Sequence, residues 1–157
     1  MGTDKIKLAL IGLGQRGLRL YYAAIKQRED VEIVALCDNY ETRLKEFAAM
    51  LEKEDGKKRE IFTDYKECID KSGCDCVIVS TAWNAHIEIS MYAMERKIAV
   101  GCEVGGAYSL ESLWELVRCY ERTKTPIMML ENCCYGRLEL LTLNLKRKGL
   151  LGEIVHL

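Results

Sequence analysis

Short apolar runs alternate with amphipathic segments along most of the chain. Most of the apolar runs have no internal polar alternation, which is typical of strands buried on both faces of a parallel sheet. The segments between them have the apolar spacing of helices. The pattern predicts strands at 7–11, 32–37, 61–62, 76–80, 98–102 and 127–130, and helices at 16–27, 40–53, 65–71, 86–96, 110–122 and 138–148.

This order of elements predicts the fold class. Regular alternation of strand and helix gives right-handed crossovers and places helices on both faces of the sheet. We therefore expect an α/β Rossmann fold, a doubly wound, mostly parallel sheet in three α/β/α layers, over residues 1–150. Residues 151–157, which include the strand-like segment Glu153-Ile154-Val155-His156-Leu157, are expected to begin a truncated C-terminal substrate domain.

Composition excludes several classes of function. The 157 residues carry a net charge of -1, which argues against a nucleic-acid partner, because phosphate binding needs clustered Lys and Arg. No apolar run approaches the roughly 18–20 residues of a membrane span, and the first five residues lack the apolar core of a signal peptide. The eight cysteines have no zinc-site spacing, so no metal site is expected. They are expected to be reduced thiols of a cytoplasmic protein.

A glycine motif follows the first predicted strand and opens the first predicted helix. The motif is G-x-G-x-x-G, written here as Gly12-Leu13-Gly14-Gln15-Arg16-Gly17. In this context Gly12 permits a tight turn, Gly14 lets the backbone approach a pyrophosphate, and Gly17 packs the helix on the strand. Free N–H groups at the helix start bind the anion. We therefore expect a dinucleotide to contact Gly12, Leu13, Gly14, Gln15 and Arg16.

An acidic residue closes the second predicted strand. Asp38 follows Gly17 by 21 residues, the position at which a carboxylate accepts from the adenosine ribose hydroxyls. A 2′-phosphate there would face this carboxylate at a cost of about 4 kcal/mol, taking roughly 4 Å and an effective dielectric of about 20. The expected cofactor is therefore NAD rather than NADP, although Arg43, one helical turn on, is placed to soften that preference. Asp38 as an N-cap of the following helix is compatible with this role.

Two later loops and one further residue carry a resemblance to a known family. The loops are Thr81-Ala82-Trp83-Asn84-Ala85-His86 and Cys102-Glu103-Val104-Gly105-Gly106, and the residue is Asn132. Together with the glycine motif and Asp38, they resemble the amino-terminal domain of the Gfo/Idh/MocA oxidoreductases. The first loop resembles the family's T-P-N-x-x-H loop, which passes the cofactor, and the second stands where the family carries E-K-P. The resemblance implies that the cofactor site includes Thr81, Trp83, Asn84, His86, Glu103 and Asn132.

One departure changes the implied chemistry. The lysine of E-K-P assists proton transfer from a substrate hydroxyl in many members of the family, and this chain has Val104 there, which can neither take a proton nor hold a charge. The variant with Trp83 and Glu103-Val104 resembles the branch of NAD-dependent glycoside hydrolases of the α-N-acetylgalactosaminidase type. In that branch NAD transiently oxidises the sugar at C3, which acidifies the C2 proton and permits elimination of the leaving group. The cofactor is then regenerated.

Several of these side chains have two interpretations from sequence. Arg16 either reaches the pyrophosphate or lies in solvent. Trp83 packs on the cofactor, on the substrate or in a local apolar cluster. His86 fits a residue that positions its loop better than a proton carrier. Glu103 and Asn132 follow strands at the carboxyl edge, where open α/β sheets bind ligands.

Three functions remain open from sequence. The first is hydride transfer between NAD and a sugar or sugar-like alcohol, in a homo-oligomeric full-length protein. The second is the glycosidase-type cycle, whose acid and base residues lie largely in the second domain. The third is a non-catalytic module that only senses NAD. For either enzyme, we expect this chain alone to be inactive, because substrate positioning contributes roughly 7–11 kcal/mol to the barrier reduction.

Overall fold

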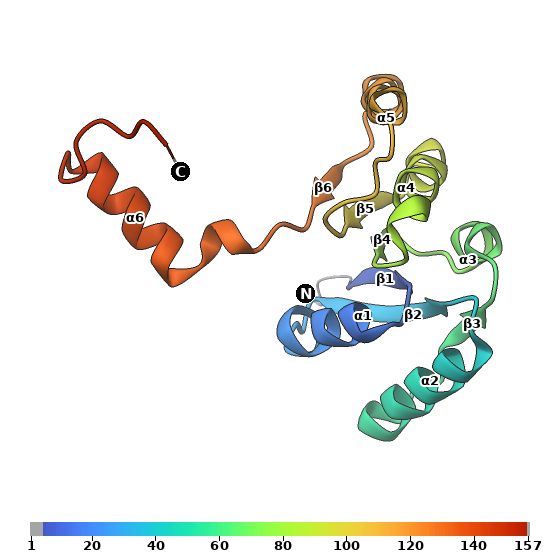
Figure 1. Cartoon of the computed structure of the whole chain (residues 1–157). Helices are drawn as coiled ribbons and strands as arrows, with labels where there is room; N and C mark the ends of the chain where they lie inside the picture. The colour runs from blue at the N-terminus through green and yellow to red at the C-terminus, as the bar shows by residue number, and fades with distance from the viewer. Residues whose placement is uncertain (1–4, 157) are drawn as a thin grey trace.

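The computed structural model describes residues 5–156, and its core is a parallel sheet of six strands. The strands occur in the order β3-β2-β1-β4-β5-β6, and every neighbouring pair is parallel (Figure 1). Their bounds are β1 Ile6–Ile11, β2 Val31–Cys37, β3 Glu60–Phe62, β4 Cys76–Val79, β5 Ala99–Cys102 and β6 Ile127–Met129. This is the doubly wound Rossmann arrangement that the alternation of elements predicted.

Helices connect the strands, and each predicted helix or strand up to residue 148 begins and ends within two residues of its predicted bounds. The helices are α1 Gln15–Leu20, α2 Glu41–Asp55, α3 Tyr65–Lys71, α4 His86–Glu95, α5 Leu110–Thr123 and α6 Arg137–Arg147. The first predicted helix is divided, because α1 continues as a π-helical turn, η1 (Tyr21–Ile25). Short 3₁₀ turns, η2 (Trp83–Ala85) and η3 (Cys133–Tyr135), follow β4 and β6.

Alternate residues of the strands build two separate cores. In β1, Leu8 and Leu10 pack with Leu36, Leu44 and other residues beneath α1 and α2. The intervening β1 residues join the opposite core, which is formed with α3, α4 and α5. Period-two alternation with both faces apolar is what buries a parallel strand on both sides. Helices therefore form layers on the two faces of the sheet.

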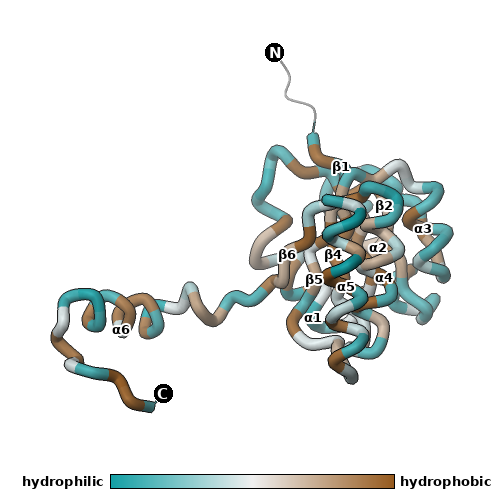
Figure 2. Tube along the Cα trace, turned by 90° about the horizontal axis from the view of Figure 1, so that it is seen from above, coloured by the Kyte–Doolittle hydropathy of each residue, from teal (hydrophilic) through white to brown (hydrophobic). Residues whose placement is uncertain are grey.

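The C-terminal segment departs from the body of the domain. Helix α6 projects away from the sheet, and none of its residues is buried (Figures 1 and 2). Residues 153–156 have no strand conformation, and the expected start of a second domain at 151–157 stays a prediction. A strand needs a hydrogen-bonded neighbour, and none pairs with these residues in the described structure. Leu157 and residues 1–4 lie outside the described residues. Within 5–156, no helix is long and apolar enough to cross a membrane.

Candidate functional site

A cavity of about 570 Å³ opens at the carboxyl edge of the sheet, where strand order reverses between β1 and β4. Open α/β sheets bind ligands at such a switch point. Seven of the residues predicted to bind a cofactor line this cavity: Gly12, Gly14, Gln15, Arg16, Asp38, Thr81 and Asn84. Five predicted residues do not line it: Leu13, Trp83, His86, Glu103 and Asn132.

The turn after β1 fits tightly against the end of β4. Gly12 has φ +94°, and a Cβ there would lie 2.5 Å from the carbonyl carbon of Ser80. A Cβ on Gly17 would lie 2.3 Å from the Gly12 carbonyl oxygen, which also accepts a 2.7 Å hydrogen bond from the Ser80 hydroxyl. Only glycine fits at either position, so these two glycines fix where α1 begins.

The start of α1 is open toward the cavity. Gly14 is the N-cap of this helix and supplies no side-chain hydrogen bond to the first turn. A Cβ on Gly14 would meet nothing nearer than Arg43 Nη1, at 4.0 Å. The first N–H groups of a helix have no intrahelical acceptor, so this turn presents backbone donors to an anion. Its position in the cavity wall fits the diphosphate of a dinucleotide.

Asp38 stands at the end of β2 with its carboxylate largely buried, at 6% exposure. Its Oδ2 accepts from the Leu13 backbone N–H at 2.7 Å, and Oδ1 accepts from the Tyr40 N–H at 2.9 Å. An ionised carboxylate has about four lone-pair sites, so two remain for ribose hydroxyls. The N-cap interpretation is wrong in detail, because the N-cap of α2 is Tyr40. Leu13 also departs from expectation, since its N–H already bonds Asp38 and its side chain belongs to the core.

Arg43 completes the wall beside Asp38. Its Nη1 lies 3.9 Å from Asp38 Oδ2, and its guanidinium lies over the Tyr40 ring, 4.4 Å from the centroid. Sequence reasoning noted Arg43 and missed several other lining residues: Asn39, Tyr40, Thr63 and Tyr65. The available signal was their position directly after β2 and β3, at the same sheet edge as Asp38.

Arg16 joins the loops after β1, β5 and β6. Its Nη2 lies 2.8 Å from Glu103 Oε1 and donates to Asn132 Oδ1 at 3.1 Å. The hydrogen bond to the Glu103 carboxylate raises the pKa of Arg16. Neither interpretation from sequence anticipated this, because Arg16 was expected at the pyrophosphate or in solvent. Glu103 and Asn132 therefore both contact Arg16, which lines the cavity, although they do not line it themselves.

A buried histidine, His86, supports the loop after β4. His86 is 1% exposed, and its Nε2 lies 3.0 Å from the Thr81 carbonyl oxygen. Since the carbonyl is an acceptor, this ring nitrogen donates. The prediction that His86 contacts the cofactor does not match this position, because its ring is enclosed under the loop. His86 fixes the backbone of Thr81, which lines the cavity, as does Asn84 in the same loop.

Comparison with known proteins identifies relatives for this arrangement. Residues 6–130 match the family described as "Oxidoreductase family, NAD-binding Rossmann fold" (GFO_IDH_MocA). A glycosyl hydrolase family 109 protein from Stenotrophomonas maltophilia is 38% identical over 98% of this chain and 35% of its own length. An alpha-N-acetylgalactosaminidase from Bacteroides fragilis is 37% identical over 96% of this chain and 36% of its own length. The chain thus spans about a third of the length of these relatives.

Solved structures agree on the fold. The crystal structure of myo-inositol 2-dehydrogenase from Lactobacillus plantarum superposes with a TM-score of 0.86 at 22% identity, over 97% of this chain and 44% of that one. An oxidoreductase from Agrobacterium radiobacter, crystallised with NAD+, L-tartaric acid and magnesium, gives a TM-score of 0.81 at 26% identity, over 96% of this chain and 42% of that one. The Rossmann architecture is therefore shared with both dehydrogenase-type proteins, one of which was crystallised with NAD+.

Proposed function

Because this chain belongs to the Gfo/Idh/MocA oxidoreductase family and carries its NAD-binding Rossmann fold, we propose that it holds NAD for hydride transfer at a carbon of a sugar or sugar-like alcohol. The observation that carries the proposal is the cavity at the switch point, with an uncapped, open helix start on one wall and the Asp38 carboxylate on another. These are the two features that dinucleotide binding needs at this place in the fold.

Different residues of this chain would bind different parts of the cofactor. The backbone at Gly14 and the first turn of α1 would receive the diphosphate, and Asp38 would accept hydrogen bonds from the adenosine ribose. Bound NAD supplies a hydride acceptor at its nicotinamide ring. Arg16 fixes the Glu103 carboxylate and the Asn132 amide at the same sheet edge. These two groups are suited to orient a polar ring, because one accepts and the other both donates and accepts.

Among hydride-transfer reactions we favour the redox-neutral glycosidase cycle. The relatives at 37–38% identity have glycosyl hydrolase names, and one is named alpha-N-acetylgalactosaminidase. The position of the family's lysine is occupied by Val104, which is 38% exposed and offers no group for proton transfer. A chain without that lysine suits a reaction whose base and acid lie in another domain. Since this chain spans about a third of such relatives, we assign those groups to sequence beyond residue 150.

Net dehydrogenation is the second candidate, supported by the inositol dehydrogenase among the structural relatives. The full-length protein that contains this chain distinguishes the two. With a nitrophenyl α-N-acetylgalactosaminide, release of nitrophenol without accumulation of NADH supports the glycosidase cycle. Accumulation of NADH with free sugars, and no cleavage of the glycoside, supports net dehydrogenation. Absence of both reactions, with NAD still bound, would support a module that only senses NAD.

Two features bear on the cellular location and the oligomeric state of the whole protein. All eight cysteines are free thiols in this structure, which suits the reducing environment of a cytoplasm. Several large apolar side chains of α5 are exposed: Leu110, Leu113, Trp114, Val117 and Tyr120. Exposed apolar patches of this kind commonly mark protein contacts, so they support a homo-oligomer. Sedimentation of the full-length protein tests this, and a monomer at micromolar concentration would refute it.

A further inference from the structure

Helix α5 has two apolar faces, and only one of them packs on the sheet. Leu116 and Cys119 join the core through the first face. The second face is made by the large exposed side chains of the helix: Leu110, Leu113, Trp114, Val117 and Tyr120, each 43% to 71% exposed. Residues three and four positions apart lie on the same side of a helix, so these five form one stripe, called here the α5 stripe. An apolar surface of this kind marks a contact with another molecule or segment.

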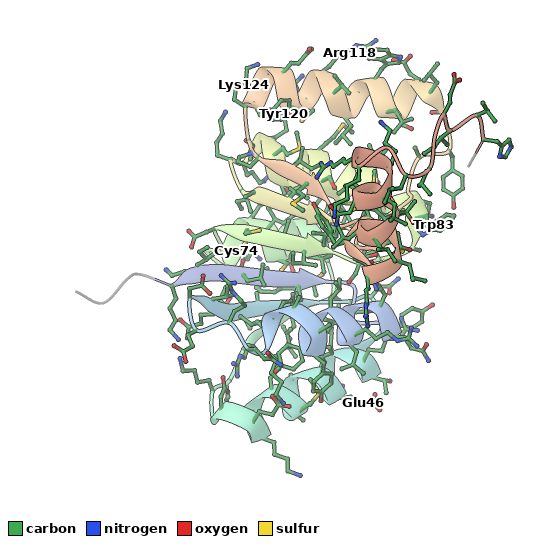
Figure 3. The ribbon with its side chains drawn as sticks, turned by 90° about the vertical axis from the view of Figure 1, so that its left-hand side faces the viewer. Glu46, Cys74, Trp83, Arg118, Tyr120 and Lys124 are labelled. Atoms are coloured by element: carbon green, nitrogen blue, oxygen red, sulfur yellow. The ribbon has the colours of Figure 1, made fainter. Side chains whose placement is uncertain are left out.

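The α5 stripe lies away from the cofactor cavity. Figure 3 shows Arg118, Tyr120 and Lys124 along α5, at the opposite end of the domain from Glu46 on α2. Strands β5 and β6 form this end of the sheet. No residue of α5 lines the 570 Å³ cavity. A partner on the α5 stripe would therefore leave the cavity open.

A row of charged side chains runs beside the α5 stripe. Its members are all exposed and follow one another at intervals of four, three and four positions, which keeps them on one side of the helix: Glu111, Glu115, Arg118 and Arg122. The first half of the row is acidic and the second half is basic. Within the chain Arg118 pairs with Glu111 at 2.8 Å, and Arg122 pairs with Glu95 of α4. These ion pairs are exposed, so an exchange of partners costs little.

We propose that the α5 stripe binds the α5 stripe of a second copy of this chain, with the two helices antiparallel about a two-fold axis. This inference rests on the homo-oligomer proposed above. A two-fold axis perpendicular to both helices brings the two charged rows to the same side of the pair and reverses one of them. The acidic half of each row then faces the basic half of the other.

The register of the two helices follows from the sequence of the row. Glu111 lies opposite Arg122 of the second copy when Glu115 lies opposite Arg118 of the second copy, because both pairs share the same midpoint. The same midpoint places Leu113 opposite Tyr120 of the second copy. One arrangement therefore joins opposite charges along the side of the contact and apolar side chains at its centre.

Other arrangements of two α5 helices lack this match. A two-fold axis parallel to the helices makes a parallel pair and puts the two charged rows on different sides, where they cannot meet. A head-to-tail contact pairs the α5 stripe with a different surface and leaves one stripe uncovered unless the subunits close a ring. The antiparallel pair covers both stripes in one closed contact.

The test measures the association of the full-length protein that contains this chain, by sedimentation over a range of concentrations. Leu113→Glu puts a charge into the α5 stripe. Its matched control is Ile61→Glu, because Ile61 is 48% exposed, against 45% for Leu113, and lies on β3 at the other edge of the sheet. Glu115→Arg and Arg118→Glu each place like charges opposite one another, and the double variant that carries both exchanges restores opposite charges. The Kd for NAD of every variant, by calorimetry, checks that the fold and the cavity are retained.

We expect the wild-type protein to contain an even number of subunits, because a closed assembly with a two-fold contact does. Leu113→Glu should raise the dissociation constant of this contact at least about tenfold, equivalent to about 1.4 kcal/mol. Glu115→Arg and Arg118→Glu should each raise it about threefold or more, and the double variant should return to within about threefold of wild type. Ile61→Glu should leave it unchanged within about twofold, and all variants should keep the wild-type Kd for NAD to the same precision.

Each contrary result refutes a different statement. A wild-type protein that sediments as a monomer would refute both the homo-oligomer and the α5 pairing. An oligomer that Leu113→Glu leaves intact would refute the α5 pairing and leave the homo-oligomer standing. A double variant that associates no better than the single exchanges would refute the antiparallel arrangement. If the wild-type protein does not bind NAD, the proposed hydride transfer fails, whatever the association shows.

Discussion

Replacing Asp38 by asparagine changes the proposed ribose contact with little change in size. The carboxylate accepts from two backbone N–H groups, Leu13 at 2.7 Å and Tyr40 at 2.9 Å. The amide of Asn can accept from only one of them and presents NH₂ to the other. Since Asp38 is 6% exposed, the second N–H loses an acceptor that water cannot readily replace. A buried donor left unpaired costs about 1–3 kcal/mol, so Asp38→Asn should lower the free energy of unfolding by that amount.

The substitution should change cofactor affinity more than it changes stability, and in opposite directions for NAD and NADP. A hydrogen bond to a carboxylate contributes about 1.5–3 kcal/mol, so NAD affinity should fall roughly 10- to 100-fold. For NADP, removal of the carboxylate charge relieves a repulsion of about 4 kcal/mol, taking roughly 4 Å and a dielectric of about 20. Arg43, 3.9 Å from Asp38 Oδ2, would then face the 2′-phosphate with its charge uncompensated. The ratio of the NADP Kd to the NAD Kd should therefore fall at least about 100-fold.

Calorimetric titration of the wild-type chain and of Asp38→Asn with both dinucleotides measures this ratio. Asp70→Asn is the control, because Asp70 is an exposed carboxylate of α3 paired with Arg96, outside the cavity wall. It should leave both constants unchanged within about twofold. If Asp38→Asn keeps the wild-type ratio, or if the wild-type chain binds NADP more tightly than NAD, then Asp38 is not the ribose contact.

Three further changes have defined expected outcomes. Gly12→Ala places a Cβ against the backbone of Ser80 at φ +94°, so the free energy of unfolding in urea should fall by about 3 kcal/mol or more. A fall of less than about 1 kcal/mol would contradict the tight turn. Arg16→Met leaves the Glu103 carboxylate, whose side chain is 11% exposed, without its cation. Because Arg16 itself is 42% exposed, the free energy of unfolding measured by thermal unfolding should fall by only about 1 kcal/mol. Arg59 lowers the pKa of Asp55 to about 2 from an ordinary value near 3.8, so its ion pair stabilises the fold above about pH 4, and this contribution is lost as pH falls toward 2. In Asp55→Asn, the fall in the free energy of unfolding between about pH 4 and pH 2 should be smaller by at most about 1 kcal/mol, since Asp55 is 44% exposed. An unchanged fall would exclude the ion pair as its cause.

The elements that sequence predicted well are those whose signal is local. An apolar run ending in Gly12, followed by Gly14 and Gly17, identified both the first strand–helix junction and its chemistry. Asp38 was identified because its distance from the glycine motif is nearly fixed by one β-α-β unit. Strand and helix bounds followed because each segment repeats its apolar period over several residues.

What sequence did not predict depends on contacts between distant segments. Arg16 and Asn132 are 116 positions apart, and nothing local indicates that a guanidinium joins them. The need for glycine at 105 and 106 arises only from the close approach of Trp83 and His86. The strand-like segment at 153–157 also depends on a distant partner, because no strand lies beside residues 153–156 in the described structure.

The most direct test of cofactor binding is a crystal structure of this chain grown with NAD. We predict that the diphosphate lies against the backbone N–H groups of Gly14 and the first turn of α1, with the adenosine ribose hydroxyls donating to Asp38. A dinucleotide bound elsewhere on the domain, or a diphosphate that makes no contact with this turn, would contradict the assignment of the site.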